Sequence, residues 1–363
     1  MTELQKTTAL LEAGIEAGLH PGAQVYVSRA GQPLADFAIG DASPGVPMTP
    51  GCLLPWLSAG KPLTAVAIMQ LVDEGELGLD DPVVSHLPEF GHRGKDTVRV
   101  RHLLTHTAGF RCRVDMEEQA CDWEHALQQI YQSSLERNWV PGERAGYQAR
   151  SSWYVLGELV QSITGQELEA WLWERILKPL GLECTSLALD ETKFAEYGDR
   201  IALMHDTRSG AAVAEDPFNT PESVGRCIPG SSARGPIRDL GRFYEAFLEG
   251  GRGVISAETV CAMTSRQRQG MHDESFNHIV DWGLGLLLDS NQYGADTVPY
   301  GYGRHASPRT YGHSGRRSSA GFADAEHGLA VAIAVNGRPA PDVHMVRFRE
   351  LLSAVYVDLD ITS

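Results

Sequence analysis

The sequence predicts an α+β fold in which an antiparallel sheet is flanked by helices and carries a mostly helical inserted lobe. Strand-like apolar runs occur near both ends of the 363-residue chain, and the long region between them is dominated by helical periodicity. A sheet built from both chain ends, with the helical middle as an insertion, accounts for this order. We expect the functional site where the two lobes meet, because ligands preferentially occupy such clefts.

The sheet lobe is predicted to comprise residues 1–78 and 240–363. Its first two strands form a hairpin, because the turn-like segment 30–32 separates them. The strand-like runs assigned to this lobe lie at 23–29, 33–39, 283–288, 319–323 and 329–336. The helices assigned to it lie at 1–20, 58–74 and 342–357.

The helical lobe is predicted to comprise residues 79–239. Apolar residues recur there at the spacing of amphipathic helices, and strand-like alternation is weak. No internal repeat or low-complexity linker interrupts it. The helical segments of the middle region lie at 100–104, 122–135, 151–164, 167–176 and 236–248.

Composition argues against several classes of partner. With 42% hydrophobic and 21% charged residues, the chain has the make-up of an ordinary globular protein. The formal net charge is −16 and the acidic residues are scattered. Neither nucleic acid nor an anionic membrane is therefore expected as a partner, because both bind basic patches. No run of eighteen apolar residues predicts a transmembrane helix.

The amino terminus predicts a cytoplasmic protein. Residues 1–20 lack the basic start and the uninterrupted apolar core of a signal peptide. A leader that was removed is the alternative.

The most informative motif is Ser58-Ala59-Gly60-Lys61, immediately before the apolar run 63–71. A serine and a lysine three residues apart at the start of a helix project from the same face, so the amine reaches the hydroxyl. A serine hydroxyl needs an adjacent base, and a lysine serves when burial or a neighbouring cation lowers its pKa. The helix amino terminus also favours a developing oxyanion. The pattern predicts Ser58 as the nucleophile and Lys61 as its base.

With this S-x-x-K pattern, the chain resembles the superfamily of serine β-lactamases and penicillin-binding proteins, closest to class C-like carboxylesterases of the family VIII type. The resemblance runs nearly end to end, with its motifs in the expected order. It implies the β-lactamase/transpeptidase-like fold, with the active site between the lobes. The matching stretches are 21–23, 71–82, 100–110, 141–142 ahead of Tyr147, 153–165, 231–250 and 282–285.

The resemblance implies a second catalytic side chain, Tyr147. In the family a tyrosine opens a Y-x-N or similar loop facing the serine, and its phenol or phenolate shuttles the proton with the lysine. Packing alone is the alternative role for Tyr147. The sequence departs from the pattern at Ala149, where many relatives carry an asparagine that contacts the amide side chain of a β-lactam. Ala149 is therefore a substrate-binding position at which lactam recognition is in doubt.

The third motif is His313-Ser314-Gly315-Arg316, which stands where the lactamases have K-T-G. The resemblance implies that its first three residues bind substrate and that the backbone N–H groups of Ser58 and Arg316 form the oxyanion hole. His313 in place of lysine is a second departure, familiar among esterase-like members. A histidine there donates a hydrogen bond, positions the tyrosine or binds a carboxylate when charged. A surface histidine beside a turn is the alternative.

Two interpretations remain for some other side chains. Trp56 either lines an acyl pocket, as a substrate-binding residue, or fills the core. His102 and His106 have no third ligand candidate and no H-E-x-x-H pattern, so no metal site is predicted. The family resemblance implies that their segment is a structural support loop. The basic stretch 304–317 either binds an acidic group of the substrate or lies exposed. No phosphate-loop or dinucleotide motif is present, and no cofactor is expected.

These residues predict a serine hydrolase that works through an acyl-enzyme. Carboxylic esters are the first expected substrates, because Ala149 and His313 both depart from the lactam-binding pattern. Acyl transfer from a thioester or ester donor is the second reading, and a β-lactamase or D-amino-acid peptidase is the third. A catalytically silent binding or scaffold homologue is the minor alternative. The expected partner is a small-molecule ester or acyl substrate, and the protein is expected to be a monomer or small homo-oligomer.

Overall fold

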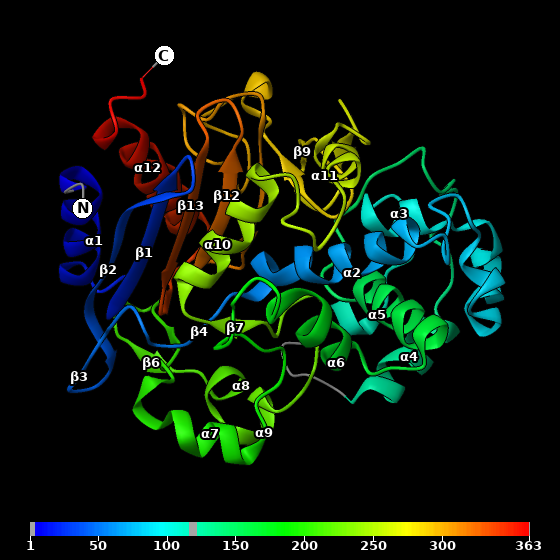
Figure 1. Cartoon of the computed structure of the whole chain (residues 1–363), viewed down its shortest axis with the longest axis horizontal. Helices are drawn as coiled ribbons and strands as arrows, with labels where there is room; N and C mark the ends of the chain where they lie inside the picture. Colours follow the sequence, from blue (N-terminus) through cyan, green and yellow to red (C-terminus); the bar gives the residue numbers. More distant parts are fainter. Residues whose placement is uncertain (1–3, 116–121, 363) are drawn as a thin grey trace.

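The structure, a computed structural model, describes residues 4–115 and 122–362. At its centre lies a seven-stranded sheet in the order β10-β11-β12-β13-β1-β2-β3 (Figure 1). Every pairing in this sheet is antiparallel, which confirms the predicted α+β class. Its strands are β1 (Gly22–Arg29), β2 (Gln32–Ser43), β3 (Val46–Pro47), β10 (Leu287–Leu288), β11 (Thr310–Gly315), β12 (Ser319–Asp324) and β13 (Leu329–Val335).

The two ends of the chain meet inside this sheet. β1, near the amino terminus, pairs with β13, near the carboxyl terminus, in a register that runs from Ala23 opposite Val335 to Arg29 opposite Leu329. Both strands are flanked by further strands, so the pairing is internal to the sheet. The sheet therefore forms only when the intervening region has brought the two chain ends together.

β13 packs against helices on both faces of the sheet, because successive side chains of a strand point to opposite faces. Val331 and Ile333 belong to the core shared with α1 (Gln5–Glu16) and α12 (Pro341–Asp358). Ala332 belongs to the core shared with α10 (Ile237–Leu248), which packs on β1, β12 and β13. The small alanine face lets α10 lie close to the sheet.

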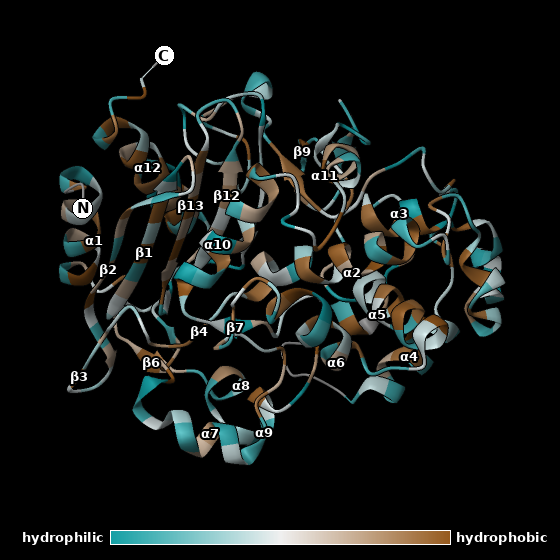
Figure 2. Cartoon of the chain, viewed as in Figure 1, coloured by the Kyte–Doolittle hydropathy of each residue, from teal (hydrophilic) through white to brown (hydrophobic). Residues whose placement is uncertain are grey.

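α2 (Lys61–Asp73) runs between the sheet and the helical lobe (Figure 1). Every residue from Lys61 to Leu71 is buried, so no side of the helix faces solvent over this stretch. Figure 2 shows this contrast in colour, with α2 and β13 mostly hydrophobic and α7 (Glu191–Tyr197), which has no buried residue, mostly hydrophilic. α5 (Ser151–Thr164) and α6 (Leu168–Leu172) pack against α2, and α3 (Val100–Leu104) and α4 (Trp123–Gln132) pack against α5.

Short elements complete the described part of the chain. The remaining helices are α8 (Asp216–Asn219), α9 (Pro221–Val224) and α11 (Ala257–Thr264). The remaining strands are β4 (Leu54–Pro55), β5 (His205–Asp206), β6 (Val213–Ala214), β7 (Arg234–Gly235), β8 (His272–Asp273), β9 (His278–Ile279) and β14 (Gly337–Arg338).

Two predicted elements differ from the structure. The helix expected over 58–74 is a 3-10 turn, Leu57–Gly60, followed by α2. Of the strand expected over 283–288, only the two residues of β10 are in strand conformation. The residues before β10 instead form a turn, in which the backbone N–H of Gly283 donates to the carbonyl oxygen of Leu286 and that of Gly285 donates to the carbonyl oxygen of Leu104.

The predicted lobe boundaries stay a prediction. The boundary expected between residues 239 and 240 falls within α10, which is one continuous helix packed on the sheet. Within 4–115 and 122–362, no helix has the length and apolar character that crossing a membrane requires.

Truncating the centre of β13 tests the packing of the sheet. Ile333 is fully buried between the sheet and α12, so Ile333→Ala should lower the free energy of unfolding by about 2–5 kcal/mol. Urea denaturation measures this loss. Val213→Ala is the control, because Val213 is 57% exposed and should change stability by less than about 0.5 kcal/mol. Equal effects of the two substitutions would contradict the assigned core.

Candidate active site

The serine and the lysine of the S-x-x-K motif lie at the junction of two helical segments. Ser58 lies in the 3-10 turn Leu57–Gly60, and Lys61 is the first residue of α2. The Lys61 Nζ atom is 2.9 Å from Ser58 Oγ. Leu57, directly before the serine, has a φ of +52°, which is uncommon outside glycine. Such strained backbone is common at functional sites, and here it directly precedes the predicted nucleophile, Ser58.

The Lys61 amine has three oxygen atoms around it. Besides Ser58 Oγ, its Nζ is 2.8 Å from the carbonyl oxygen of Ala149 and 2.7 Å from that of Gly230. Lys61 is fully buried. A Cβ atom at position 230 would lie 2.8 Å from Trp153 Cγ and 3.1 Å from Nζ, so glycine permits this close packing. The amine thus joins α2 to two loops that are distant in sequence.

Burial lowers the pKa of Lys61 well below its ordinary value of 10.5. The Arg150 cation lowers it further, while Asp115 raises it. A neutral amine has two N–H donors and one lone pair. At rest Nζ donates to Ser58 Oγ and to both carbonyl oxygens. Once the amine is neutral, the two carbonyl oxygens hold its two N–H bonds and its lone pair is available for the hydroxyl proton of Ser58. This arrangement suits a general base.

Tyr147 lies on the other side of the serine. Its phenol O–H donates to Ser58 Oγ over 3.0 Å, so the serine oxygen lies between the phenol and the lysine amine. Burial raises the pKa of Tyr147 above its ordinary value, and the contact with Ser58 offsets this only in part. The tyrosine is therefore a neutral phenol at rest, a proton donor rather than a phenolate base.

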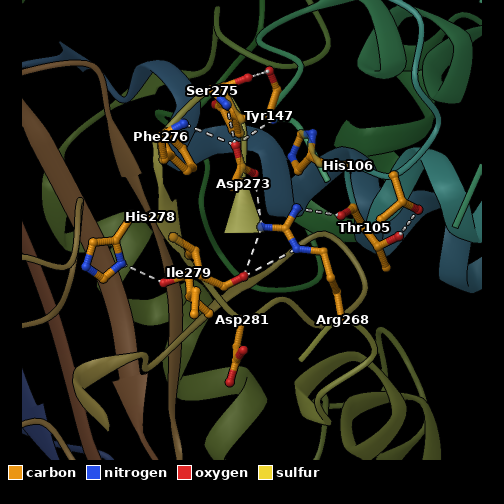
Figure 3. Close-up of polar contacts among 12 residues, drawn as sticks. Thr105, His106, Tyr147, Arg268, Asp273, Ser275, Phe276, His278, Ile279 and Asp281 are labelled. Carbon is orange, nitrogen blue, oxygen red and sulfur yellow. Dashed lines mark hydrogen bonds and ion pairs between the residues drawn. The ribbon is translucent and has the colours of Figure 1, made fainter. Parts of the chain in front are cut away.

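A buried ion pair holds the Tyr147 loop in place (Figure 3). Arg268 Nη2 is 3.0 Å from Asp273 Oδ2, with both side chains almost completely buried. The other carboxylate oxygen, Oδ1, accepts the backbone N–H groups of Tyr147, Ser275 and Phe276 at 2.9–3.1 Å. Arg268 also donates to carbonyl oxygens of the surrounding chain. The pair therefore fixes the backbone from which the tyrosine projects.

Aromatic rings fix the side chain of Tyr147. The ring of His106 lies 4.6 Å from it and that of Phe276 lies 4.9 Å from it, centroid to centroid. His106 is fully buried, and its Nδ1 accepts the backbone N–H of Gln148 over 3.1 Å. Burial lowers the pKa of His106 well below its ordinary value, so this ring is neutral. His106 supports the tyrosine loop.

Sequence reasoning did not find Arg268 and Asp273, and it gave His106 only a general supporting role. Arg268 and Asp273 are an ordinary arginine and aspartate in a turn-rich stretch. No spacing rule connects them to a tyrosine more than a hundred residues away. Only the pairing of Arg268 with the Trp282 backbone brings them behind the site.

The end of β11 lies against the turn that carries Ser58. A Cβ atom at Gly315 would lie 2.3 Å from the carbonyl oxygen of Trp56 and 3.2 Å from Leu57 Cβ, so glycine permits this close approach. Ser319 fixes the same carbonyl with a hydrogen bond of 2.7 Å. The backbone that follows Gly315 is thereby placed beside the first turn of the 3-10 segment, where amide N–H groups lack intrahelical partners.

His313 is buried and uncharged. Its Nδ1 donates to the carbonyl oxygen of Ser314 over 2.9 Å, so Nε2 is left as an acceptor. Burial, together with the nearby Lys61, lowers the pKa of His313 to about 3. The ring is 4% exposed and lies 6.2 Å from the Tyr147 ring. These features favour packing near the tyrosine over the predicted binding of a carboxylate by a charged histidine.

Three other residues that were predicted to bind substrate make different contacts in the structure. Trp56 is fully buried and its indole N–H donates to the carbonyl oxygen of Gly235, so its side chain belongs to the core. Ser314 points to the opposite face of β11 from His313, toward the carbonyl oxygen of Tyr300. Ala149 does line the site, but its backbone carbonyl makes the polar contact.

The basic side chains of the stretch 304–317 lie at different locations in the structure. Arg304 forms ion pairs with Asp296 and Glu350, away from the serine. Arg317 donates to the carbonyl oxygen of Pro339. Arg316 lines a cavity of about 100 Å³ beside Ser58.

The pH dependence of the free energy of unfolding reports the protonation state of Lys61. Its folded pKa lies below its unfolded value, so the unfolded chain binds more protons in the pH window between the two. The free energy of unfolding of the wild type, relative to Lys61→Met, should therefore rise with pH across that window and fall as pH decreases. The slope should approach about 1.4 kcal/mol per pH unit. Urea denaturation of both proteins over a pH series measures it; a difference independent of pH would mean a charged lysine.

Comparison with known proteins identifies the family. A family model for beta-lactamases matches residues 8–356. Esterase EstB of Burkholderia gladioli is 29% identical over 357 residues, covering 87% of this chain and 86% of EstB. A penicillin-binding protein homologue from Caulobacter crescentus superimposes with a TM-score of 0.78 at 26% identity, covering 98% of this chain and 97% of that one.

The fold recurs in EstCE1, described as a hydrolase with promiscuous acyltransferase activity. Its TM-score is 0.80 at 21% identity, with 97% of this chain and 98% of EstCE1 covered, a likeness of fold alone. These structures confirm the predicted β-lactamase/transpeptidase-like fold. Because the family model spans nearly the whole sequence, the chain belongs to the beta-lactamase family.

Proposed function

We propose that the protein is a serine hydrolase that cleaves carboxylic esters through an acyl-enzyme on Ser58. The observation that carries this proposal is the placement of one serine oxygen between a buried lysine amine at 2.9 Å and a tyrosine phenol at 3.0 Å. A nucleophile, a base and a proton donor are thus within hydrogen-bond reach of one another. The likeness to esterase EstB supports the choice of ester as substrate class.

The first half of the reaction forms the acyl-enzyme. The neutral amine of Lys61 takes the hydroxyl proton of Ser58 as Oγ attacks the ester carbonyl. The resulting oxyanion is held by the backbone N–H groups of Ser58 and Arg316. When the intermediate collapses, the leaving alkoxide takes a proton from the Tyr147 phenol, which regains one from the Lys61 ammonium.

The second half releases the acid. Water attacks the acyl carbonyl, passing its proton toward the tyrosine and lysine, and Ser58 leaves with a proton returned to its oxygen. An alcohol or amine in place of water would make the same site an acyltransferase. Hydrolysis and transfer therefore differ only in the acceptor, and the small-molecule acyl donor is common to both.

Two features favour esters over lactams. A β-lactam or peptide needs its amide side chain and its carboxylate held, whereas an activated ester needs only the nucleophile, the base and the oxyanion hole. Ala149 offers no side-chain hydrogen bond. His313 has a pKa lowered to about 3 and carries no charge at neutral pH where the lactamase motif has a lysine.

Active-site labelling tests the nucleophile. Incubation with a fluorophosphonate should add one phosphonyl group, mapped by mass spectrometry to the peptide that contains Ser58. Ser58→Ala should take up none and should lose ester hydrolysis. Ser209→Ala is the control, because Ser209 lies exposed in a turn, and it should label as the wild type does. Full activity of Ser58→Ala would exclude the proposed mechanism.

Competing substrates test the ester preference. The kcat/KM for short p-nitrophenyl esters should exceed that for nitrocefin by several powers of ten. A missing hydrogen bond to a charged group accounts for roughly 1.5–3 kcal/mol of this, or about one to two decades. Comparable values would instead support a lactamase or peptidase. Slow hydrolysis of both, with rapid reaction of a thioester and an alcohol, would support an acyltransferase.

A further inference from the structure

The indole ring of Trp153, in α5, lies over the amine of Lys61. The Lys61 Nζ atom is 5.3 Å from the centre of this ring and 5.4 Å from the centre of the Tyr147 ring. Neither Trp153 nor Lys61 has any exposed surface. Besides its three hydrogen-bond partners, the amine therefore has two aromatic rings as neighbours and no face open to water.

Two glycines give the indole a narrow slot. A Cβ atom at Gly230 would lie 2.8 Å from Trp153 Cγ, and a Cβ atom at Gly285 would lie 3.5 Å from Trp153 Cη2. Gly230 also offers its carbonyl oxygen to Lys61 Nζ at 2.7 Å. The same loop thus contacts the indole and binds the amine, so the ring and the amine are fixed relative to each other.

The N–H groups of the five buried indoles divide according to their place in the molecule. Those of Trp56, Trp139 and Trp171 donate to protein oxygen atoms over 2.9–3.2 Å. Those of Trp153 and Trp282 have no partner in the described part of the chain, and these two rings lie beside the lysine or the tyrosine of the site. A buried N–H without a partner lowers stability. Stability alone therefore does not explain an indole at position 153.

An aromatic ring in this position has two opposing effects on the amine. Its π face attracts an ammonium ion, which favours the charged form by roughly thirtyfold when the pair is desolvated. Its bulk excludes water, and complete burial favours the neutral amine by about a thousandfold or more. The exclusion of water is the larger effect, in agreement with the lowered pKa of Lys61, for which burial is the main cause.

We propose that Trp153 is a positioning residue that keeps water away from the Lys61 amine and so maintains it as the base. This proposal rests on the proposed function, since it takes Lys61 as the group that accepts the Ser58 proton. Among the described residues, Trp153 is not one that lines the cavity beside Ser58. It therefore acts through Lys61 and not on the substrate.

The other groups around the amine do not obscure this effect. The titratable and charged groups that face it are Tyr147, His106, His313, Arg150 and Asp115. The first three are uncharged, because burial raises the pKa of the phenol and lowers the pKa of both imidazoles. Arg150 and Asp115 are unchanged by a substitution at position 153. A difference between the wild type and a Trp153 variant therefore reports the effect of the ring.

The pH profile of ester hydrolysis tests the proposal. In Trp153→Leu the smaller side chain admits water beside the amine, which stabilises the ammonium and raises the pKa of Lys61. The acid limb of kcat/KM for p-nitrophenyl acetate should move to higher pH by at least about one unit, a tenfold change in the ratio of ammonium to amine. Trp153→Phe keeps a ring and should move the limb in the same direction by a smaller step, so it carries the test if Trp153→Leu does not fold.

Trp171→Leu is the matched control for these variants. Trp171 is also a buried tryptophan, but its indole N–H donates to Gln70 near the other end of α2. Its loss should lower stability and leave the acid limb at the pH of the wild type. Cooperative unfolding in urea shows that each variant is folded.

A stability measurement separates this proposal from the proposed function. The free energy of unfolding relative to the matching Lys61→Met protein rises with pH above the folded pKa of Lys61, and in Trp153→Leu this rise should begin at least about one pH unit higher than in the wild type. If the wild type cleaved no ester, the proposed function would fail, and this rise would still decide the role of Trp153.

Two results would overturn the proposal. Rates lowered equally at every pH, with the acid limb and the stability rise at their wild-type positions, would make Trp153 a packing residue. A move of both to lower pH would mean that the ring acts mainly by attracting the ammonium ion. Either result leaves Ser58 as the nucleophile of an active esterase.

Discussion

The candidate site depends above all on the burial of one amine. Lys61 is fully buried yet meets three oxygen atoms, and two of these belong to loops 88 and 169 residues away in the sequence. A charged ammonium would resist such burial, whereas a neutral amine with two carbonyl acceptors fits it. The same contacts that close the core around α2 therefore hold the amine within hydrogen-bond distance of Ser58 Oγ. The burial of the Lys61 amine thus serves both the packing around α2 and the proposed chemistry.

Around this amine, the structure uses buried polar groups to fix geometry. The ion pair of Arg268 and Asp273 lies in the interior and anchors the backbone of Tyr147. Such a pair contributes little net stability compared with a well-packed apolar core, but each guanidinium nitrogen and each carboxylate oxygen in it has at least one hydrogen-bond partner. Removing either member would leave a buried charge. We infer that this network is retained because it holds the phenol within reach of the serine oxygen.

The distribution of charge around the serine differs from that of the molecule as a whole. The chain is strongly acidic, yet Arg150, Arg234, Arg316 and Arg338 all line the cavity beside Ser58. On the other side of the serine the groups are uncharged, because burial lowers the pKa of His106 and His313 and raises that of Tyr147. The proton-transfer side is thus neutral, whereas the cavity side holds arginines, of which Arg338 forms an ion pair with Glu215.

The sequence by itself determined the features that depend on local geometry. The spacing of Ser58 and Lys61 is set by one helical turn, and the alternation in β13 by the pleat of a strand, so both could be predicted without a structure. Family motifs, also local, predicted Tyr147. Tertiary structure alone decided what the amine touches, that Trp56 fills the core, and that Arg234 lines the cavity beside Ser58. These contacts join segments far apart in the chain, and only the close packing of the whole molecule fixes their distances.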